Sequence, residues 1–375
     1  MKLKQLIFSL SFIFICSIVF AQVKHKKPKT LEINQPAPDF NLKGVDGKMH
    51  SLQSYSKSKV LVIVFSANHC PTAQAYEERL IAITNDYKDK GVELIMISSN
   101  DPLAVMPGEL AWTDVGDSYE DMIFRHKDKN FNFPYLYDGD TQKTALAYGA
   151  QATPHTFVFN AERKLKYVGR IDQIEKPDKG GNGEDLRKAI NSVLAGKDPN
   201  PAVTKAFGCS TKWSWKIEER AKKPQKPGPP VTLETISIDG IKELVKNDTD
   251  KLTLINVWAT WCGPCVAEFS DLVLLNQTYR RRGFGVVTIS TDRLDKQARV
   301  HDFLKEEKAI GKNYISSESN KYKLIEAIDP EWQGPLPYTM LVEPGGKVIY
   351  RHQGIIDMHE MKRLIVDHPS IGRFF

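Results

Sequence analysis

Two cysteines separated by Gly-Pro give the strongest chemical signal in the sequence. Cys262 and Cys265 follow a continuous apolar run and stand where a helix is expected to begin. Thiols at this spacing are able to close a small disulfide ring, and the positive end of the helix dipole stabilises the first sulfur as a thiolate. In such motifs the pKa of the first thiol falls from about 8.5 to about 7. Half of a zinc site and a structural disulfide are the alternatives. The sequence shows no second metal-binding pair, and a disulfide inside one helix would constrain little of the chain, so the pattern favours redox chemistry.

A second candidate thiol, Cys70, stands between His69 and Pro71 at another junction of a buried strand and a helix. The helix N-terminus and a neighbouring imidazolium would both lower its pKa. The alternative is a buried and unreactive small apolar residue. Cys209 lies on the tail of the same half of the chain. Three states are open to Cys209: a resolving thiol for Cys70, a static disulfide with Cys70, or a free thiol.

The elements that must position these cysteines occur twice in the same order. For the first half we expect a hairpin around Asp46-Gly47, strands at 60–66 and 92–98, a helix at 74–87, a strand pair at 157–160 and 164–168, and a helix at 184–194. For the second half we expect strands at 252–258 and 284–290, helices at 262–279 and 297–307, a strand pair at 338–343 and 347–350, and a last helix at 359–366. Strand–helix alternation followed by a hairpin predicts an α/β layered sheet in each half. In the helix at 74–87 we expect Glu77, Glu78 and Arg79 to be exposed.

Length and composition agree with two globular domains. The chain has 375 residues, of which 41% are hydrophobic and 26% charged, which excludes wholesale disorder, a collagen and a coiled-coil rod. Between the halves, residues 216–230 are rich in proline and lysine, and we expect an extended linker without packed elements there. The formal net charge of +6 is too small to indicate a nucleic-acid partner without a concentrated basic patch.

The N-terminus predicts export. Residues 1–21 combine Lys2 and Lys4 with an apolar core and a cleavage site at Val19-Phe20-Ala21, which is typical of a secretory signal peptide. An uncleaved membrane anchor is the alternative, but the apolar run is short and lacks a stop-transfer pattern. Cys16 would be lost with the signal. The remaining cysteines are too few for a structural disulfide framework in an exported chain of this size.

The second half resembles a known family through three groups of residues. These are the run Asn256-Val-Trp-Ala-Thr-Trp-Cys-Gly-Pro-Cys265, then Glu268, then Leu336-Pro337-Tyr338-Thr339. They make residues 231–375 similar to the thioredoxin superfamily, and within it to exported TlpA/ResA-type thiol–disulfide oxidoreductases. The resemblance implies that Cys262 attacks a partner disulfide, that Cys265 resolves the mixed disulfide, and that Pro337 is a cis-proline facing the cysteines. A simple loop breaker is the alternative for Pro337.

A glutamate and two tryptophans near the motif lead to further hypotheses. Glu268 matches a glutamate of the exported branch, and we hypothesise that it manages the proton of Cys265; an ordinary solvated helix glutamate is the alternative. Trp258 and Trp261 are expected to pack around the site rather than to take part in chemistry.

The first half, residues 31–215, resembles a peroxiredoxin-like redoxin family. The resemblance rests on Ala37-Pro-Asp-Phe40, Asn68-His-Cys-Pro71, Phe133-Pro-Tyr-Leu-Tyr137, Thr153-Pro154, Tyr167-Val-Gly-Arg170 and Gly208-Cys-Ser-Thr-Lys-Trp213. Family members commonly carry cysteines where this chain has Ala67 and Ala152, and the peroxidatic Pro-x-x-x-Thr-x-x-Cys pattern is missing. A dithiol site at positions 67 and 70 is therefore impossible. Pro154 and His69 are expected at a groove of this domain.

Two further residues of this half, Arg170 and His155, each have two possible roles. Arg170 is either a salt-bridged strand residue, which is favoured, or an anion contact. His155 either borders the groove next to Pro154 or, as is commoner, lies on the surface.

Together these patterns predict two tandem thioredoxin-like α/β domains with central mixed sheets and an exported, periplasmic enzyme that exchanges protein disulfides. No metal and no cofactor beyond the Cys262–Cys265 disulfide are expected. The expected partners are protein thiols and disulfides and a membrane thiol electron donor, with no nucleic acid and no stable membrane insertion. In this enzyme the first domain is expected to be a degenerate redoxin domain that serves as a partner thiol site or a client-facing module. The competing hypotheses are a thiol peroxidase, with Cys70 as the peroxidatic residue and the second domain as its reductant, and a first domain that is a non-catalytic binding module. Either enzymatic hypothesis, the disulfide-exchanging oxidoreductase or the thiol peroxidase, implies a role in antioxidant defence and redox homeostasis.

Overall fold

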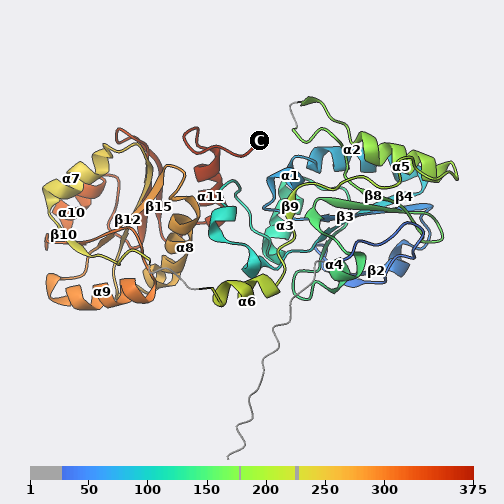
Figure 1. The fold of residues 1–375 in the computed structure, drawn as a ribbon. Helices are drawn as coiled ribbons and strands as arrows, with labels where there is room; N and C mark the ends of the chain where they lie inside the picture. The colour runs from blue at the N-terminus through green and yellow to red at the C-terminus, as the bar shows by residue number, and fades with distance from the viewer. Residues whose placement is uncertain (1–27, 177–178, 224–227) are drawn as a thin grey trace, which may run out of the picture.

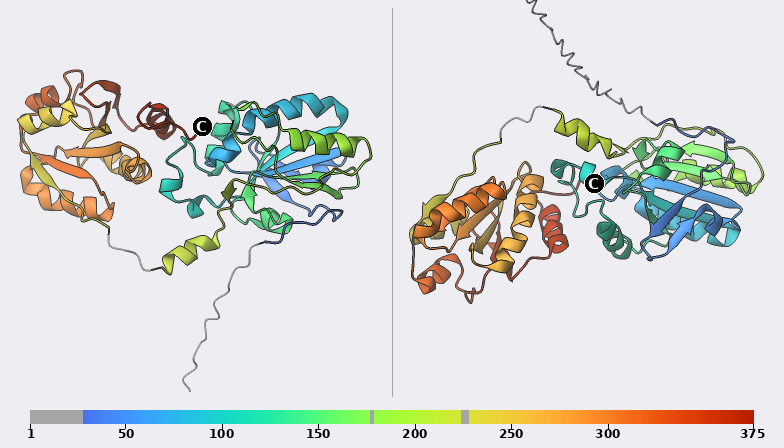
Figure 2. Two further views of the ribbon diagram at one scale, coloured as in Figure 1. Left: turned by 45° about the horizontal axis from the view of Figure 1, so that its top comes forward. Right: turned by 90° about the horizontal axis from the view of Figure 1, so that it is seen from below.

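The computed structural model describes residues 28–176, 179–223 and 228–375. The signal-peptide prediction for residues 1–21 lies outside these ranges. The described chain forms two domains that lie side by side in every view (Figures 1 and 2). Each domain has a mixed β-sheet between layers of helices, so the prediction of two tandem α/β domains is confirmed.

The first domain contains a seven-stranded sheet in the order β2-β1-β5-β4-β3-β7-β8. Its strands are β1 (Asn41–Gly44), β2 (Met49–Ser51), β3 (Val60–Ser66), β4 (Val92–Ser98), β5 (Tyr135–Tyr137), β7 (His155–Phe159) and β8 (Leu165–Gly169). Strand β3 pairs in parallel with β4 and antiparallel with β7. A separate two-stranded ladder joins β6 (Ala152–Thr153) to β9 (Cys209–Ser210).

The helices of the first domain cover both faces of this sheet. They are α1 (Pro71–Gln74), α2 (Glu77–Tyr87), α3 (Tyr119–Asp128), α4 (Lys143–Tyr148), α5 (Glu184–Leu194) and α6 (Trp215–Ala221). Strand β3 is buried along its whole length, and its side chains enter separate apolar clusters on the two faces of the sheet. A continuous β-branched run at this position is what a central strand covered on both faces requires.

The second domain contains a six-stranded sheet in the order β10-β13-β12-β11-β14-β15. Its strands are β10 (Glu234–Ile236), β11 (Leu252–Trp258), β12 (Phe284–Ser290), β13 (Lys312–Ser316), β14 (Tyr338–Val342) and β15 (Val348–Gln353). Its helices are α7 (Ile238–Lys246), α8 (Gly263–Tyr279), α9 (Gln297–Glu306), α10 (Lys321–Ile328) and α11 (Met358–Asp367). The strand and helix predictions for this half are confirmed, with ends that differ by a few residues.

The prediction of an unpacked linker over residues 216–230 is wrong at its start. Helix α6 covers Trp215–Ala221, and the Arg220 guanidinium donates hydrogen bonds to the carbonyls of Ala104 and Leu103. The prolines of this stretch begin only at Pro224, so they leave a preceding segment of good helix formers intact.

The prediction of an exposed charged face on the helix at 74–87 is also wrong in part. Glu78 is exposed, but Glu77 and Arg79 are buried. Arg125 of α3 holds the Glu77 carboxylate through two hydrogen bonds, of 3.0 and 2.6 Å. Arg79 donates to backbone carbonyls of residues 174–176 and lies 3.7 Å from the Asp172 carboxylate. Partners far along the chain allow both charges to be buried.

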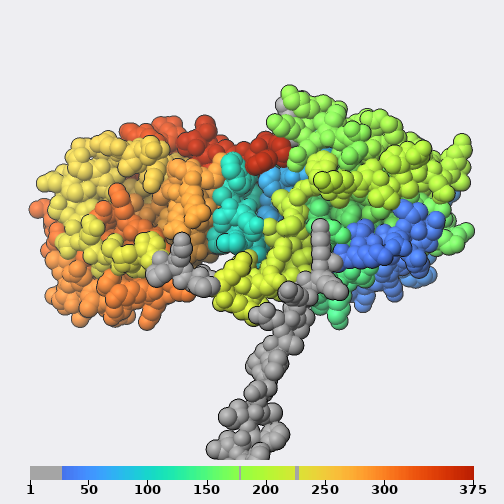
Figure 3. Space-filling view, in the orientation of Figure 1, coloured from blue at the N-terminus to red at the C-terminus, as the bar shows by residue number. Residues whose placement is uncertain are grey.

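The two domains meet through α8, α11 and the C-terminal segment, which face α3 and the loop before it in the first domain (Figure 1). The Tyr279 hydroxyl donates to the Thr113 carbonyl, and Arg363 and Arg373 both bind the buried Asp114 carboxylate. The C-terminal segment, in red, lies across the junction in the space-filling view (Figure 3). Phe374 of this segment packs edge-on against Trp112. The contact between the domains is therefore partly apolar and partly ionic.

Candidate functional site

Cys262 and Cys265 are joined by a disulfide at the start of α8. Strand β11 ends at Trp258, the chain turns, and Cys262 is the residue that caps the helix, with its sulfur accepting a hydrogen bond of 3.3 Å from the Cys265 amide. Cys262 is 6% exposed, whereas Cys265 is fully buried. An incoming reactant therefore meets Cys262 first.

Pro337 lies at the same end of β11 as the disulfide. The Leu336–Pro337 peptide bond is cis, and β14 begins directly after it. Strand β14 pairs antiparallel with β11 so that Tyr338 stands opposite Val257. Continuing this register brings Pro337 level with the end of β11, where the turn to the cysteines starts.

Glu268 lies one helical turn after Cys265 and is buried, so it is not a solvated helix glutamate. Its two carboxylate oxygens accept hydrogen bonds from the Asn256 side-chain amide at 3.0 Å and the Ile356 backbone amide at 3.1 Å. Burial raises the pKa of Glu268 to about 7, although both hydrogen bonds act to lower it. A carboxyl with this pKa exchanges protons near neutral pH.

A groove opens beside the disulfide. It has a volume of about 980 Å³, and its apolar lining includes Trp261, Leu294, Tyr322, Trp332 and Leu336. The prediction that both tryptophans pack around the site holds for Trp258, which contacts Phe269 and Phe303, but it is wrong for Trp261. Trp261 is 68% exposed, because the residue next to Cys262 forms part of the groove wall.

The first domain places Cys70 at the equivalent junction, between β3 and α1. Cys70 is fully buried, and its sulfur lies 3.0 Å from the Thr153 carbonyl oxygen. The Thr153–Pro154 peptide bond is cis, and Cys209 packs against the cluster that contains Cys70. The structure thus brings Cys70, Pro154 and Cys209 together, with both cysteines as free thiols.

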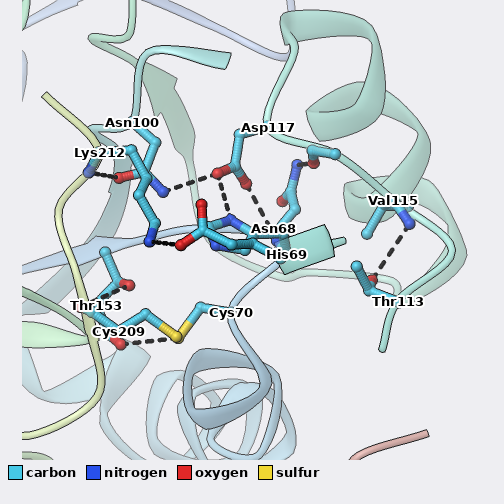
Figure 4. A network of polar contacts seen from close by, with 12 residues as sticks. Asn68, His69, Cys70, Asn100, Thr113, Val115, Asp117, Thr153, Cys209 and Lys212 are labelled. Carbon is cyan, nitrogen blue, oxygen red and sulfur yellow. Dashed lines mark hydrogen bonds and ion pairs between the residues drawn. The ribbon is translucent and has the colours of Figure 1, made fainter. Parts of the chain in front are cut away.

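His69 points to a buried acid. Its Nδ1 lies 2.6 Å from an Asp117 carboxylate oxygen, and Asp117 also accepts a hydrogen bond of 2.7 Å from Asn100 (Figure 4). Burial alone would lower the pKa of His69, but the charge of Asp117 and the hydrogen bond to it raise the pKa above its ordinary value. Asp117 was missed by the sequence analysis because it lies far from His69 in the chain and no motif marks it.

The surroundings of Arg170 and His155 decide between the alternatives given for them. Arg170 binds Asp185 at 2.6 Å, as the salt-bridged alternative predicts. His155 is 5% exposed, so the surface alternative is wrong: it follows Pro154 into β7, where the sheet covers it. Burial lowers the pKa of His155 to about 4.

The two cysteine sites do not meet. The hydrogen bonds between the domains start from Tyr279 at the C-terminal end of α8, from Arg282 just beyond it, and from α11 and the C-terminal segment. Cys262 stands at the other end of α8, about 25 Å away along the helix axis. An encounter between the two sites therefore requires the domains to reorient.

Within residues 28–176, 179–223 and 228–375, no cluster of three or more His, Cys, Asp or Glu side chains has the arrangement of a metal site. In the same ranges, no helix has both the length and the apolarity needed to cross a bilayer.

A family model matches each half of the chain. The model of the AhpC/TSA family matches residues 33–168, and the Redoxin model matches residues 223–365. Both domains are redoxin-like members of the thioredoxin superfamily. The redoxin-like domain with the Cys262–Cys265 disulfide is thus joined to a second redoxin-like domain that holds Cys70.

Curated relatives match about a third of the chain. Thiol-disulfide oxidoreductase ResA of Bacillus subtilis is 29% identical over 125 residues, which are 32% of this chain and 65% of that protein. Thiol:disulfide interchange protein DsbE of Pasteurella multocida is 35% identical over 104 residues, 28% of this chain and 51% of that protein. The chain therefore spans between half and two thirds of the length of these curated relatives.

Among solved structures, a hypothetical protein of Sinorhizobium meliloti 1021 shares 32% identity with the chain. The match covers 50% of this chain and 97% of that one, with a TM-score of 0.44. An uncharacterized conserved protein of Geobacillus kaustophilus shares 33% identity, with coverages of 50% and 95% and a TM-score of 0.45.

Proposed function

We propose that this chain is an exported thiol–disulfide oxidoreductase that reduces or exchanges protein disulfides through Cys262 and Cys265. The observation that carries the proposal is the asymmetry of the pair. Cys262 is slightly exposed and directly follows Trp261, which lines an open groove, while Cys265 and the titratable Glu268 are buried. The names of the two curated relatives, a thiol-disulfide oxidoreductase and a thiol:disulfide interchange protein, support the same reaction class.

In the reductive direction, the Cys262 thiolate attacks one sulfur of a client disulfide. A bond forms between Cys262 and that sulfur, and the other client sulfur leaves as a thiolate that takes up a proton. Cys265 then gives its proton to the Glu268 carboxylate and attacks Cys262, which releases the second client thiol. Two electrons pass from the cysteine pair to the client, and the product is the Cys262–Cys265 disulfide. The reverse sequence oxidises a client dithiol.

The groove supports a protein client. Its apolar wall of Trp261, Tyr322 and Leu336 would bind side chains that flank the client cysteine, while Pro337 at the edge of β14 would border the client backbone. In the exported protein, continued reduction of clients would need electrons from a membrane thiol donor. The predicted signal peptide at residues 1–21 supports export to the periplasm.

A trapping experiment tests the proposal. With Cys265→Ser, the attack on Cys262 that releases the client is blocked, so mixed disulfides should accumulate on Cys262 and be identified by mass spectrometry. The matched variant Cys262→Ser should trap nothing at the buried Cys265. If the two variants trap clients equally, the assignment of Cys262 as the attacking residue is wrong.

The role of Glu268 has a separate test. The pKa of Cys265 in the reduced protein, measured by the pH dependence of alkylation, should change in Glu268→Gln because the proton acceptor is lost. An unchanged pKa of Cys265 would end the proton-transfer role of Glu268 without affecting the assignment of Cys262.

A further inference from the structure

Cys70 and Cys209 meet although 138 positions of sequence separate them. They are the free cysteines of the described residues, and Cys209 packs against an apolar cluster of Cys70, Ala67 and Ala73. The interaction between the two side chains lowers the pKa of Cys70 and raises the pKa of Cys209. Cys70 is buried and Cys209 is half-buried, so the pair lies just inside the surface.

A short backbone ladder holds Cys209 at this place. Strand β9 runs antiparallel to β6, and Cys209 stands opposite Thr153, the residue before cis-Pro154. Gly208 makes this approach possible: its φ is +140°, and a Cβ there would lie 2.2 Å from the Thr153 carbonyl oxygen. A side chain at position 208 would push β9 away from β6.

The surroundings shift the pKa values of the two thiols in opposite directions. Burial alone would raise the pKa of Cys70, but interactions with the Cys209 and Thr153 side chains and with the Ala73 backbone amide, together with the charge of His69, lower it to about 6. The interaction with Cys70 raises the pKa of Cys209, and burial adds to this effect. Helix α1 is too short for its dipole to explain the difference. These directions favour Cys70 as the nucleophile of the pair and Cys209 as the thiol that keeps its proton.

A network of polar side chains behind the pair holds the imidazole of His69, whose charge favours the Cys70 thiolate. His69 binds Asp117, the Asn100 side-chain amide donates to Asp117, and the Asn100 side-chain oxygen accepts from the Lys212 backbone amide at 2.8 Å (Figure 4). Lys212 follows Cys209 closely in the chain, so the same network anchors the segment that carries Cys209. The Lys212 ammonium forms an ion pair with Glu109.

The two domains therefore supply a second sulfur in different ways. In the second domain it comes from the helix itself, at Cys265, and the face beside cis-Pro337 is an open groove. In the first domain, Ala67 and Ala73 flank Cys70 and cannot supply a sulfur, and the chain's own β9 occupies the strand edge beside cis-Pro154. In the described residues, Cys209 is the free thiol that packs against the cluster of Cys70.

We propose that Cys70 and Cys209 form a second redox couple, a dithiol that reduces small or protein disulfides and becomes a Cys70–Cys209 disulfide. The Cys70 thiolate attacks one sulfur of the disulfide substrate, a mixed disulfide forms on Cys70, and the other substrate sulfur leaves as a thiolate and is protonated. Cys209 then loses its proton and attacks the Cys70 sulfur, which releases the second substrate thiol. Two electrons go from the cysteine pair to the substrate. This couple does not depend on the activity proposed for Cys262 and Cys265.

The test uses the full chain with Cys262→Ser and Cys265→Ser, so that the second domain cannot react. Oxidised glutathione is the probe, applied with reduced glutathione at graded ratios, and the products are quenched with acid, alkylated and mapped by mass spectrometry. We expect a Cys70–Cys209 cross-linked peptide whose fraction rises from near zero to more than half across the series. Peptides containing Cys16 are distinguished by their mass.

Three further variants in this background keep the result interpretable. Cys209→Ser should stop the reaction at the mixed disulfide of Cys70 with glutathione. Cys209→Ser with Ser210→Cys moves the thiol by one residue along β9, to the opposite side of the strand, and should restore little of the cross-link. Gly208→Ala keeps both cysteines but displaces β9, so the cross-linked fraction should fall at least several-fold while circular dichroism stays unchanged.

Several outcomes would overturn the proposal. Absence of the Cys70–Cys209 peptide at every glutathione ratio, in protein with an unchanged circular dichroism spectrum, would show that the two thiols do not form a couple. Equal cross-linking from position 210 would show that proximity in β9 is irrelevant. If hydrogen peroxide oxidises Cys70 more than tenfold faster than oxidised glutathione at equal concentration, the substrate class is peroxides rather than disulfides.

Discussion

The substitution Glu268→Gln in the oxidised protein gives the sharpest test of the buried acid behind the disulfide. In the oxidised state Cys262 and Cys265 do not titrate, so a pH effect cannot come from their thiols. The glutamine amide would replace one acceptor oxygen by a donor. The side-chain oxygen of Asn256 has no hydrogen-bond partner, so rotation of the Asn256 amide would present that oxygen to the new donor. The variant is therefore expected to fold.

The expected effect follows from the direction of the pKa shift. The pKa of Glu268 is raised from 4.5 to about 7, so between these values the folded state holds a proton that the unfolded state has lost. The free energy of unfolding then falls as the pH rises from about 4.5 to about 7, by at most about 3 kcal/mol, and stays level above pH 7. Glutamine removes this penalty.

Calorimetric unfolding of the oxidised full chain at pH 5 and pH 8 measures the difference. The gap between Glu268→Gln and the unsubstituted protein should be larger at pH 8 than at pH 5, in favour of the variant, by up to about 3 kcal/mol. Other groups that titrate in this range, such as Asp138, cancel in the comparison. A gap that does not change with pH would show that Glu268 titrates in its ordinary range, and the reasoning from its burial would be refuted.

Three further predictions concern other parts of the molecule. Asp114→Asn should weaken the docking of the two domains by about 2 kcal/mol, because Arg363 and Arg373 lose their shared carboxylate; small-angle scattering should then show a larger radius of gyration, and an unchanged radius would contradict it. His155→Phe should reduce acid sensitivity between pH 6.5 and 4, because the folded pKa of His155 is lowered to about 4 and stability is lost as the unfolded chain takes up a proton below pH 6.5; equal acid unfolding of both proteins would refute this. Trp261→Ala should raise KM for a disulfide-linked peptide several-fold through loss of groove surface, and an unchanged KM would exclude this side chain from client binding.

The central strands and the cysteine-bearing helix of each domain could be predicted because their sequences carry local signals. The runs at 60–66 and 252–258 are continuous and β-branched, and the structure forms β3 and β11 over the same residues. Strand β9 and helix α6 carried no comparable signal. Two residues form β9 only because the Thr153 backbone offers a partner, and α6 sits next to a proline-rich stretch that dominated the interpretation.

The errors at individual side chains have a common physical cause. The sequence analysis places charged residues on the surface and aromatic residues in the interior. These preferences are averages over many proteins, and an individual residue departs from them when its surroundings differ. Glu77 is buried because Arg125, on another helix, neutralises it, and Trp261 is exposed because it forms the wall of a groove. His69 was singled out by its neighbour Cys70, but its partner Asp117 is brought near only by the fold.

The most direct test of the account compares the reactions of reduced Cys262→Ser and reduced Cys265→Ser with a disulfide-linked peptide. The first domain is silenced in both proteins by Cys70→Ser and Cys209→Ser. We predict that Cys265→Ser forms a mixed disulfide with the peptide at close to the rate of the protein that retains both second-domain cysteines, and that Cys262→Ser forms none. Comparable reaction of Cys262→Ser through the buried Cys265 would contradict the assignment of Cys262 as the attacking sulfur.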